Sequence, residues 1–357
     1  MINKYSEEKF DIRNFSYEEL AAYLKAEGER PFRATQIFEW LYQKGAWSFD
    51  EMNNLSKPLR VLLTERFILK PRKIAEKQIS ADGTTKFLFE LDDQQRIETV
   101  LIPTAKRTTV CVSTQAGCKF GCRFCASGIG GWKRNLTTAE IITQILHIKE
   151  ESKKHGNPLS HIVYMGVGEP LDNFAHVMKS VRIINDKKGV NIGARRITVS
   201  TCGVIPGIEQ LAKEGIQIEL AISLHGFDNA SRNVLMPVNR KYPFDDLMAA
   251  CRAYIKATKR QITFEYILIK DVTCTEKAAA ALKKSFKGII CKMNLIPYNP
   301  VSEFDCQTPS RNEMFAFKNQ LERIGIHTTL RAPRGKDVAA ACGQLRYTVD
   351  NVVRKMT

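Results

Sequence analysis

Three cysteines of this chain stand at a spacing that suits an iron–sulfur cluster. Cys118, Cys122 and Cys125 form a C-x-x-x-C-x-x-C motif, and Phe124 directly precedes the last of them. Three thiolates can hold three irons of a [4Fe–4S] cluster and leave the fourth iron open, whereas a ferredoxin motif supplies a fourth cysteine. An open iron is what S-adenosylmethionine (SAM) needs for binding and reductive cleavage. The motif therefore favours catalysis over electron storage.

Two other interpretations of the motif are a structural zinc site with its fourth ligand elsewhere and a chance group of thiols. The motif follows an apolar strand at residues 110–113. Gly117, Gly121 and Gly128 would let the backbone fold closely around a cluster. This strand-to-loop setting, together with the spacing and the aromatic residue, favours iron and sulfide over zinc.

A glycine-rich segment, Gly166-Val167-Gly168-Glu169-Pro170, follows the next expected strand. Its glycines allow close approach of a ligand, and Glu169 or nearby carbonyls could receive an ammonium group. Further polar residues come at or near the ends of later expected strands: Ser200, Ser223, His225 and Asn299. Each alone is typical of a cap or a turn. Together they predict a polar lining for one nucleoside-like ligand, beside the cluster.

Cys111, Cys342 and Glu98 lie outside these motifs. From the pattern alone, both cysteines are typical of buried thiols. Glu98 falls inside an expected strand, where alternation places it on the wet face. An acid–base role for Glu98 does not follow from the pattern.

The elements that must position these residues are strands and helices that alternate from about residue 108. The expected strands are 161–165, 197–200, 219–224, 263–268 and 292–296, with helices such as 139–151 and 247–258 between them. This alternation predicts an α/β fold with a parallel sheet, whose active-site loops lie at the carboxyl ends of the strands. Upstream, the capping box Ser16-x-x-Glu19 opens a small helical region, and strands are expected at 86–91, 96–102 and 108–113.

The composition is that of a globular protein, with 357 residues, 44% hydrophobic and 26% charged. No apolar run is long enough to span a bilayer and the polar N-terminus lacks a signal peptide, so no membrane association and a cytoplasmic location are expected. In such a chain ten cysteines indicate metal binding or catalysis rather than disulfides. A net charge of +16 fits a nucleic-acid partner, although a solvated basic surface is the alternative.

These residues resemble the radical SAM superfamily and, within it, the RlmN and Cfr family of RNA adenine methyltransferases, most closely the RlmN type. The resemblance spans nearly the whole chain, and its most specific stretches are residues 97–103, 111–118, 134–137, 239–242, 294–300 and 340–345. It implies a [4Fe–4S] cluster on the three motif cysteines and two SAM molecules per turnover. The positions that match SAM contacts are Gly168, Glu169, Ser200, Ser223, His225 and Asn299.

The family's mechanism implies a role for each remaining residue. One SAM would methylate Cys342, and a radical from the second SAM would take hydrogen from that methyl group. The methyl carbon would add to an adenine carbon, and Cys111 would resolve the adduct and leave a disulfide with Cys342. Glu98 matches the family's acidic residue near the target base. The implied activity is methylation at C2 of an adenosine in 23S rRNA, with tRNA as a candidate second substrate, an external electron donor and a monomeric enzyme.

The resemblance also implies an organisation of the chain: a helical, RNA-binding accessory domain at 1–70, a β-strand extension or linker at 71–107, a partial (β/α)6 TIM-like barrel of the radical SAM type at 108–330, and a C-terminal segment at 331–357 that carries Cys342. Departures from residues common in the family indicate a divergent branch: Ser127, Val167, Gly226 and Ala339.

Two alternatives remain open. The related C8-methylating enzymes, which confer resistance to ribosome-targeting antibiotics, share the cluster and both cysteines. Pro170 favours the C2 branch, because the C8 enzymes tend to have alanine at this position. A redox-sensing, RNA-binding iron–sulfur protein without methyl transfer is disfavoured by the three-cysteine motif and the SAM-like lining.

Overall fold

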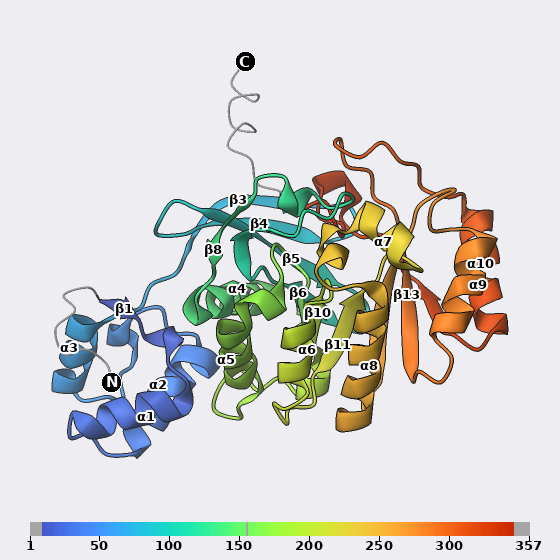
Figure 1. Ribbon diagram of the computed structural model, residues 1–357. Helices are drawn as coiled ribbons and strands as arrows, with labels where there is room; N and C mark the ends of the chain where they lie inside the picture. Colours follow the sequence, from blue (N-terminus) through green and yellow to red (C-terminus); the bar gives the residue numbers. More distant parts are fainter. Residues whose placement is uncertain (1–8, 155, 346–357) are drawn as a thin grey trace.

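A ten-stranded sheet forms the centre of the molecule (Figure 1). The computed structural model describes residues 9–154 and 156–345. The strand order is β14-β13-β12-β11-β10-β9-β6-β5-β4-β3. Strands from β6 to β14 pair in parallel, and strands from β6 back to β3 pair antiparallel. The sheet therefore combines a barrel-like parallel part with an antiparallel extension.

Six strand–helix units build the parallel part, as expected from the alternating pattern. The strands are β6 (Thr108–Cys111), β9 (Leu159–Tyr164), β10 (Ile197–Thr201), β11 (Glu219–Ser223), β12 (Ile262–Leu268) and β13 (Cys291–Pro297), followed by β14 (His327–Leu330). The helices are α4 (Thr138–Lys154), α5 (Phe174–Asn185), α6 (Ile205–Leu211), α7 (Asn229–Leu235), α8 (Phe244–Thr258), α9 (Glu276–Ser285) and α10 (Arg311–Arg323). Helices α4, α5, α6 and α8 lie side by side along one face of the sheet (Figure 1). The expected partial barrel is confirmed.

The extension consists of β3 (Lys73–Ile79), β4 (Thr85–Glu90) and β5 (Arg96–Pro103). Strand β3 was not expected from the sequence, because it is exposed almost throughout and its residues do not alternate. Lysine and glutamate are common on such edge strands, where they discourage pairing with other chains. The expected boundary at residue 107 falls inside one continuous sheet, since β5 pairs with β6. The division of the chain into domains stays a prediction.

The N-terminal helices α1 (Tyr17–Ala26), α2 (Phe32–Glu39) and α3 (Lys57–Arg66) pack around the short parallel pair β1 (Phe10–Asp11) and β2 (Phe67–Ile68). The capping box is present, because Ser16 Oγ accepts from the Glu19 N–H (3.2 Å) and Glu19 Oε2 accepts from the Ser16 N–H (2.7 Å). No helix in the described part of the chain is long and apolar enough to cross a membrane.

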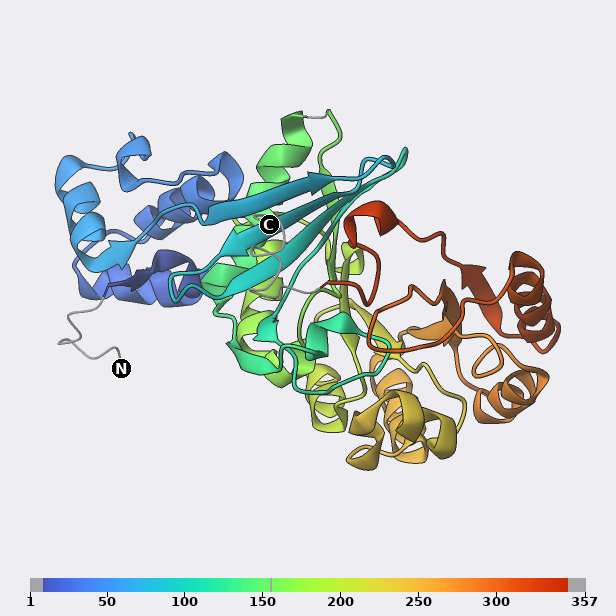
Figure 2. The same cartoon turned by 90° about the horizontal axis from the view of Figure 1, so that it is seen from above.

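The N-terminal helices, in blue, lie at one side of the molecule (Figure 2), and polar contacts join this region to α4. Lys149 Nζ donates to the carbonyl oxygen of Tyr42 (2.6 Å), and Trp47 Nε1 donates to Glu150 Oε1 (2.8 Å). At the other end of α4, Asn14 Oδ1 accepts from a backbone N–H of the first turn (2.9 Å). The N-terminal helices are thereby fixed to the same helix that follows the cysteine motif.

His147 of α4 lies at the junction of the N-terminal helices and the extension. Its ring stacks on Trp47 at 4.6 Å and lies 5.2 Å from the ring of Phe89. Its Nε2 accepts a hydrogen bond from the backbone N–H of Arg72 (3.2 Å). Burial, with Arg13 as the second cause, lowers the pKa of His147 to about 4. Protonation would remove the acceptor and place a charge in this apolar junction.

We therefore expect acid to destabilise the junction. Because the folded pKa lies below the ordinary 6.5, the contribution of His147 to stability is full above pH 6.5 and is lost as the pH falls toward 4. From pH 7 to pH 5, the free energy of unfolding should fall by about 1–2 kcal/mol more in the wild type than in His147→Gln. Chemical denaturation at both pH values measures this difference. His327→Gln, at an exposed position of β14, is the control and should keep the wild-type pH dependence; equal behaviour of the wild type and His147→Gln would contradict the assignment.

Candidate active site

One cavity at the carboxyl ends of the parallel strands gathers most of the residues selected from the sequence. These are Cys118, Cys122, Cys125, Gly168, Glu169, Ser200, Ser223, His225 and Cys342. Three selected residues, Glu98, Cys111 and Asn299, are not among its lining residues. They lie instead next to the segment that carries Cys342, as described below.

The three motif cysteines lie on one loop, residues 118–131, which we call the cysteine loop. Strands β7 (Gln115–Gly117) and β8 (Trp132–Asn135) pair at its base. Gly117 has φ +76°, and a Cβ at this position would lie 1.8 Å from the carbonyl oxygen of Gly131. Because no side chain fits there, glycine is required for the loop to close.

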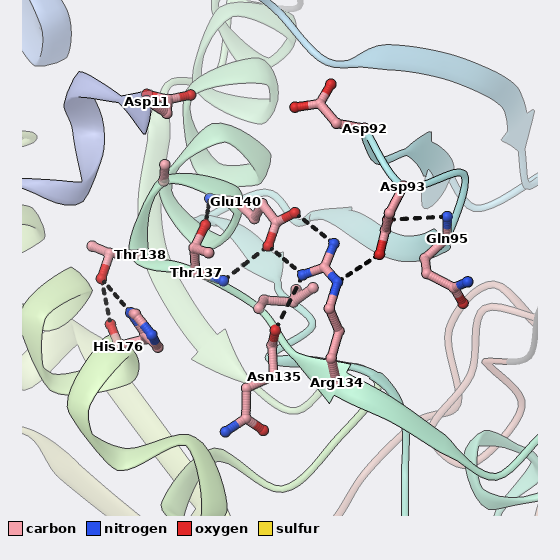
Figure 3. Close-up of polar contacts among 12 residues, drawn as sticks. Asp11, Asp92, Asp93, Gln95, Arg134, Asn135, Thr137, Thr138, Glu140 and His176 are labelled. Atoms are coloured by element: carbon pink, nitrogen blue, oxygen red, sulfur yellow. Dashed lines mark hydrogen bonds and ion pairs between the residues drawn. The ribbon is translucent and has the colours of Figure 1, made fainter. Parts of the chain in front are cut away.

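Arg134 of β8 holds the base of the cysteine loop in place (Figure 3). Its Nη1 and Nη2 donate to the two carboxylate oxygens of Glu140 at 2.8 and 2.9 Å, and its Nε donates to Asp93 at 2.7 Å. Glu140 also accepts from the backbone N–H of Thr137 (2.9 Å) and so caps α4. The hydrogen bonds to Glu140 and Asp93 raise the pKa of Arg134, which stays charged. One side chain thus ties the loop to α4 and to the turn between β4 and β5.

The donor set of the cysteine loop fits an iron–sulfur cluster. Burial raises the pKa of Cys118 to about 12 and also raises the pKa of Cys122 and Cys125. Thiolates at these positions therefore need the positive charge of bound metal to be stable. Among the described residues, no three His, Cys, Asp or Glu side chains converge as they would around a single ion. All three cysteines line the same cavity.

The glycine segment after β9 packs closely against the protein itself. A Cβ on Gly166 would lie 2.7 Å from backbone atoms of Val112 and Ser113, and one on Gly168 would lie 2.5 Å from the Cβ of Gln115. At both positions the glycine leaves room for the connection between β6 and β7. Close packing within the protein is therefore enough to explain both glycines, and their expected role of making room for a ligand stays a prediction.

Glu169 is buried, and backbone groups already hold its carboxylate. Oε1 accepts from the Leu171 N–H (3.0 Å) and Oε2 from the Cys202 N–H (2.7 Å). Burial nevertheless raises the pKa of this carboxyl group. A carboxylate has about four acceptor sites, so Glu169 keeps acceptor capacity toward the cavity that it lines.

His225 lies on the opposite wall of the cavity and is neutral. Burial, followed by the charge of Arg232, lowers its pKa to about 3. Its Nδ1 accepts from the Ile267 N–H (3.1 Å), which leaves the remaining proton on Nε2. Nearby, the hydroxyl oxygens of Ser200 and Ser223 lie 3.4 Å apart. These residues offer neutral donors and acceptors to the cavity, and their contact with a nucleoside-like ligand stays a prediction.

The segment that carries Cys342 is attached to the cysteine loop. The carbonyl oxygen of Gly343 accepts from the Ala126 N–H (2.7 Å), and that of Leu345 accepts from Ser127 Oγ (2.8 Å). Ser127, a departure from the threonine common in the family, supplies this hydroxyl. Cys342 is exposed and lines the cavity.

Asn299, which follows β13, fixes the backbone of Cys342 from another side. Its Nδ2 donates to the carbonyl oxygen of Cys342 (3.2 Å). Its Oδ1 is buried and accepts no hydrogen bond within the described residues. A buried acceptor without a donor is costly, and a ligand donor at this place would relieve the cost.

Upstream of Cys342 the same segment binds the hairpin between β3 and β4 (Figure 2). Asp337 accepts from Ser80 Oγ (2.6 Å) and from the Ala81 N–H (3.0 Å), and the Gly335 N–H donates to Asp82 (3.2 Å). Cys342 is therefore held between the extension and the cysteine loop.

Cys111 lies in β6, beneath this segment. It is buried with Ala340 and Leu345, the residues on either side of Cys342. Burial, followed by the proximity of Cys342, raises the pKa of Cys111 to about 12. Two cysteines 231 residues apart in the chain are thus brought to one place, which the sequence pattern alone did not predict.

Arg331 was missed in the sequence. It follows β14, lines the cavity and pairs with Glu265 of β12 at 3.3 Å. Burial disfavours its charge, but Cys342 and Glu265 act more strongly together, and the pKa of Arg331 is raised. Its position directly after a strand could have identified it, because Ser200 and Ser223 were selected for their positions at strand ends.

The expectation that Glu98 lies on the wet face is wrong. Glu98 of β5 is only 3% exposed, and its Oε1 pairs with Lys86 Nζ of β4 at 3.1 Å. The same Lys86 reaches the carbonyl oxygen of Ala339 (3.5 Å), because the C-terminal segment passes over this face. The C-terminal segment, which is distant in the chain, therefore buries the Glu98 side chain that strand alternation alone would place in water.

Comparison with known proteins agrees with this arrangement. Residues 112–281 match the radical SAM superfamily, and residues 10–69 match the ribosomal RNA large subunit methyltransferase N-terminal domain. The chain is 49% identical to the probable dual-specificity RNA methyltransferase RlmN of Bacillus licheniformis, over 95% of this chain and 94% of that protein. It is 48% identical to the protein of the same name in Bacillus subtilis, over 95% and 93%.

A solved structure is similar over the same length. The radical SAM methyltransferase from Sphaerobacter thermophilus superposes with a TM-score of 0.91 at 43% identity, covering 94% of this chain and 99% of that one. On this evidence the chain belongs to the RlmN family of the radical SAM superfamily.

Proposed function

We propose that this protein is a radical SAM methyltransferase that methylates C2 of an adenosine in 23S rRNA, and also in tRNA. The relatives named above are described as dual-specificity RNA methyltransferases, which supports both substrates. The observation that carries the proposal is the position of Cys342: it lines the same cavity as the three motif cysteines and lies over the buried Cys111.

Cys118, Cys122 and Cys125 would hold a [4Fe–4S] cluster, with the adjacent cavity walls for SAM. When bound, the two groups supply a methyl group and a 5′-deoxyadenosyl radical. Glu169 offers acceptor sites for an ammonium group, and Asn299 offers its buried oxygen. His225 and the two serines add neutral polar groups for the nucleoside. The apolar remainder of the cavity keeps water from the reactive carbon.

Cys342 would carry the methyl group to the base. An adenine C2 carbon is not nucleophilic, so a thiol must present the methyl group as a radical carbon. After the adduct has lost the C2 proton and one electron, for which an oxidised cluster would be the acceptor, the Cys111 thiolate would attack the sulfur of Cys342. This attack would break the bond from that sulfur to the methylene carbon, which would take up a proton and leave with the base, and an external donor would reduce the resulting disulfide. Glu98, held by Lys86 beside this segment, is the candidate acid–base group. The charge of Arg331 would favour the thiolate form of Cys111.

The rim of the cavity suits a nucleic acid. The cysteine loop and the residue pair after it carry Lys119, Arg123 and Lys133 and no acidic residue. Trp132 is 43% exposed, and Lys119 Nζ lies 5.7 Å from its ring and 5.7 Å from that of Phe120. Basic groups interleaved with aromatic rings are typical of surfaces that bind unpaired bases, and the target base must leave its stack to enter the cavity.

Mass spectrometry of ribosomal RNA and tRNA from cells with and without the gene tests the activity. We expect one methylated adenine to disappear in the deletion strain, with the methyl group on C2. A methyl group on C8 would assign the protein to the other branch. Under reducing conditions the purified enzyme should release 5′-deoxyadenosine from SAM; its failure to do so, with the cluster present, would favour the redox-sensor alternative.

Substitution of the two cysteines should separate their roles. Cys342→Ala should abolish RNA methylation because no sulfur carries the methyl group. Cys111→Ala should instead accumulate a covalent protein–RNA species, visible on a denaturing gel. Cys274→Ala is a matched control, because Cys274 is a partly buried cysteine whose Sγ contacts Glu313 on α10, outside the cavity lining. Methylation by Cys342→Ala would rule out the methyl-carrying role.

Removal of the exposed ring at the rim should weaken RNA binding. A stacked base is worth about 1–3 kcal/mol, so Trp132→Ala should raise the KM for RNA about tenfold with a smaller change in kcat. Phe315→Ala is the control: Phe315 of α10 is 41% exposed with Arg311 5.5 Å from its ring, and it does not line the cavity. Equal KM values for the two variants would show that Trp132 does not contact RNA.

A further inference from the structure

Arg232 of α7 is a buried charge behind the wall of the cavity. It has 0% exposed surface. Its Nε donates to the carbonyl oxygen of Leu224 (3.1 Å), and its Nη2 donates to that of Cys202 (2.5 Å). Its Nη1 donates to Asn239 Oδ1 (2.9 Å) and to the carbonyl oxygen of Tyr242 (3.4 Å). Within residues 9–154 and 156–345, all of these acceptors are neutral.

A second buried arginine of the same chain shows how a buried charge is usually neutralised, by a carboxylate. Arg13 is also 0% exposed, but it forms two hydrogen bonds with the carboxylate of Asp11, at 2.8 and 2.6 Å. A buried ion without a partner of opposite charge is strongly unfavourable, and neutral hydrogen bonds offset only part of the cost. The hydrogen-bond partners of Arg232 in the described chain include no such carboxylate. Its burial implies another source of negative charge.

Three thiols favour the charged form of Arg232, and two of them line the cavity. Burial lowers its pKa, and Cys202, Cys122 and Cys251 are the groups that act in the opposite direction. Cys202 lines the cavity together with Cys122. Of these thiols, only Cys122 belongs to the motif that would bind metal.

The backbone fixes α7 against the cysteine loop. The Arg123 N–H, directly after Cys122, donates to the carbonyl oxygen of Leu235 at the end of α7 (3.0 Å). On the other side, a Cβ on Gly226 would lie 2.9 Å from the Cβ of Arg232. These contacts hold the backbone of Arg232 next to the cysteine loop, and the four hydrogen bonds given above hold its guanidinium.

We propose that Arg232 is the fixed countercharge of the iron–sulfur cluster on Cys118, Cys122 and Cys125. It touches no reacting atom and acts as a positioning residue, through its field. Thiolates bound to iron carry negative charge, and uptake of one electron from an external donor adds one more. A cation held rigidly in a region of low dielectric stabilises the reduced form most and so raises the reduction potential. The inference rests on the proposed cluster, and extends it to how the protein makes that cluster reducible.

The test is an EPR-monitored redox titration of the reconstituted protein, with dithionite as the electron donor. Arg232→Gln keeps amide hydrogen bonds but removes the charge, so the midpoint potential should become more negative. Arg232→Lys keeps the charge and should return the potential most of the way to the wild-type value. Lys119→Gln is the matched control: Lys119 lies on the same loop but is 48% exposed and paired with Asp172, so its removal should shift the potential less.

Thermal unfolding of the full chain with and without cluster separates a field effect from a structural one. The wild type should gain more stability from the cluster than Arg232→Gln gains, because only the wild type offsets two opposite charges. If Arg232 acted only through its hydrogen bonds, Arg232→Gln would lower the melting temperature equally with and without the cluster and would leave the reduction potential unchanged. That result would overturn the proposal.

Arg232→Lys decides the question if Arg232→Gln does not fold. A reduction potential of Arg232→Lys close to that of the wild type supports the field effect. A large shift of the potential, although the charge is retained, contradicts it. Wild-type protein that binds no iron and sulfide would contradict the proposed function itself. Wild-type protein with a normal cluster, and variants of unchanged potential, would contradict only the role of Arg232.

Discussion

The pairing of β5 with β6 is the constraint on which the rest of the structure depends. Strand β6 pairs antiparallel with β5 on one side and parallel with β9 on the other, so one strand belongs to both the extension and the barrel. This pairing places Val100 opposite Cys111 and brings Glu98, two residues away, to the same region. It also carries the hairpin of β3 and β4 out to Asp337, which anchors the segment with Cys342. The two cysteines meet because a single sheet spans both regions.

Buried charges around the cavity follow one rule. Glu98 pairs with Lys86, Glu265 with Arg331, and Glu140 with Arg134. Such pairs add little net stability, because desolvation offsets much of their attraction, but breaking one leaves an ion in a poor solvent. Their consequence is geometric: each pair permits one arrangement of the strands that carry it. Among the described residues, Glu169 and Arg232 are exceptions, because backbone and amide groups rather than side chains of opposite charge hold them. Both lie where a charged cofactor is expected.

Local patterns predicted the elements and the cysteine loop but not the contacts between distant segments. The alternation of strands and helices and the capping box at Ser16 depend on neighbouring residues, and both are confirmed. The burial of Glu98 could not be predicted, because it depends on a segment some 240 residues further along the chain. Strand β3 was missed because its pairing with β4, rather than its own side chains, makes it a strand. The resemblance to a family supplied Cys111 and Cys342, which composition and periodicity alone assign to a core.

The proposed role of Cys342 places two demands on one sulfur atom, which would have to meet a methyl donor and then a base. The segment after it is held by the carbonyl oxygens of Gly343 and Leu345, and Cys342 itself by Asn299. Each such hydrogen bond contributes about 0.5–1.5 kcal/mol net, far less than the barrel strands contribute through their shared core. The segment can therefore change position at a cost that leaves the sheet intact. The cysteine loop is different, since Arg134 fixes its base to α4 and to the turn between β4 and β5, and Gly117 lets the loop close on itself. This difference in contacts suits the proposal, which needs a rigid site for the cofactor and a more weakly held segment for Cys342.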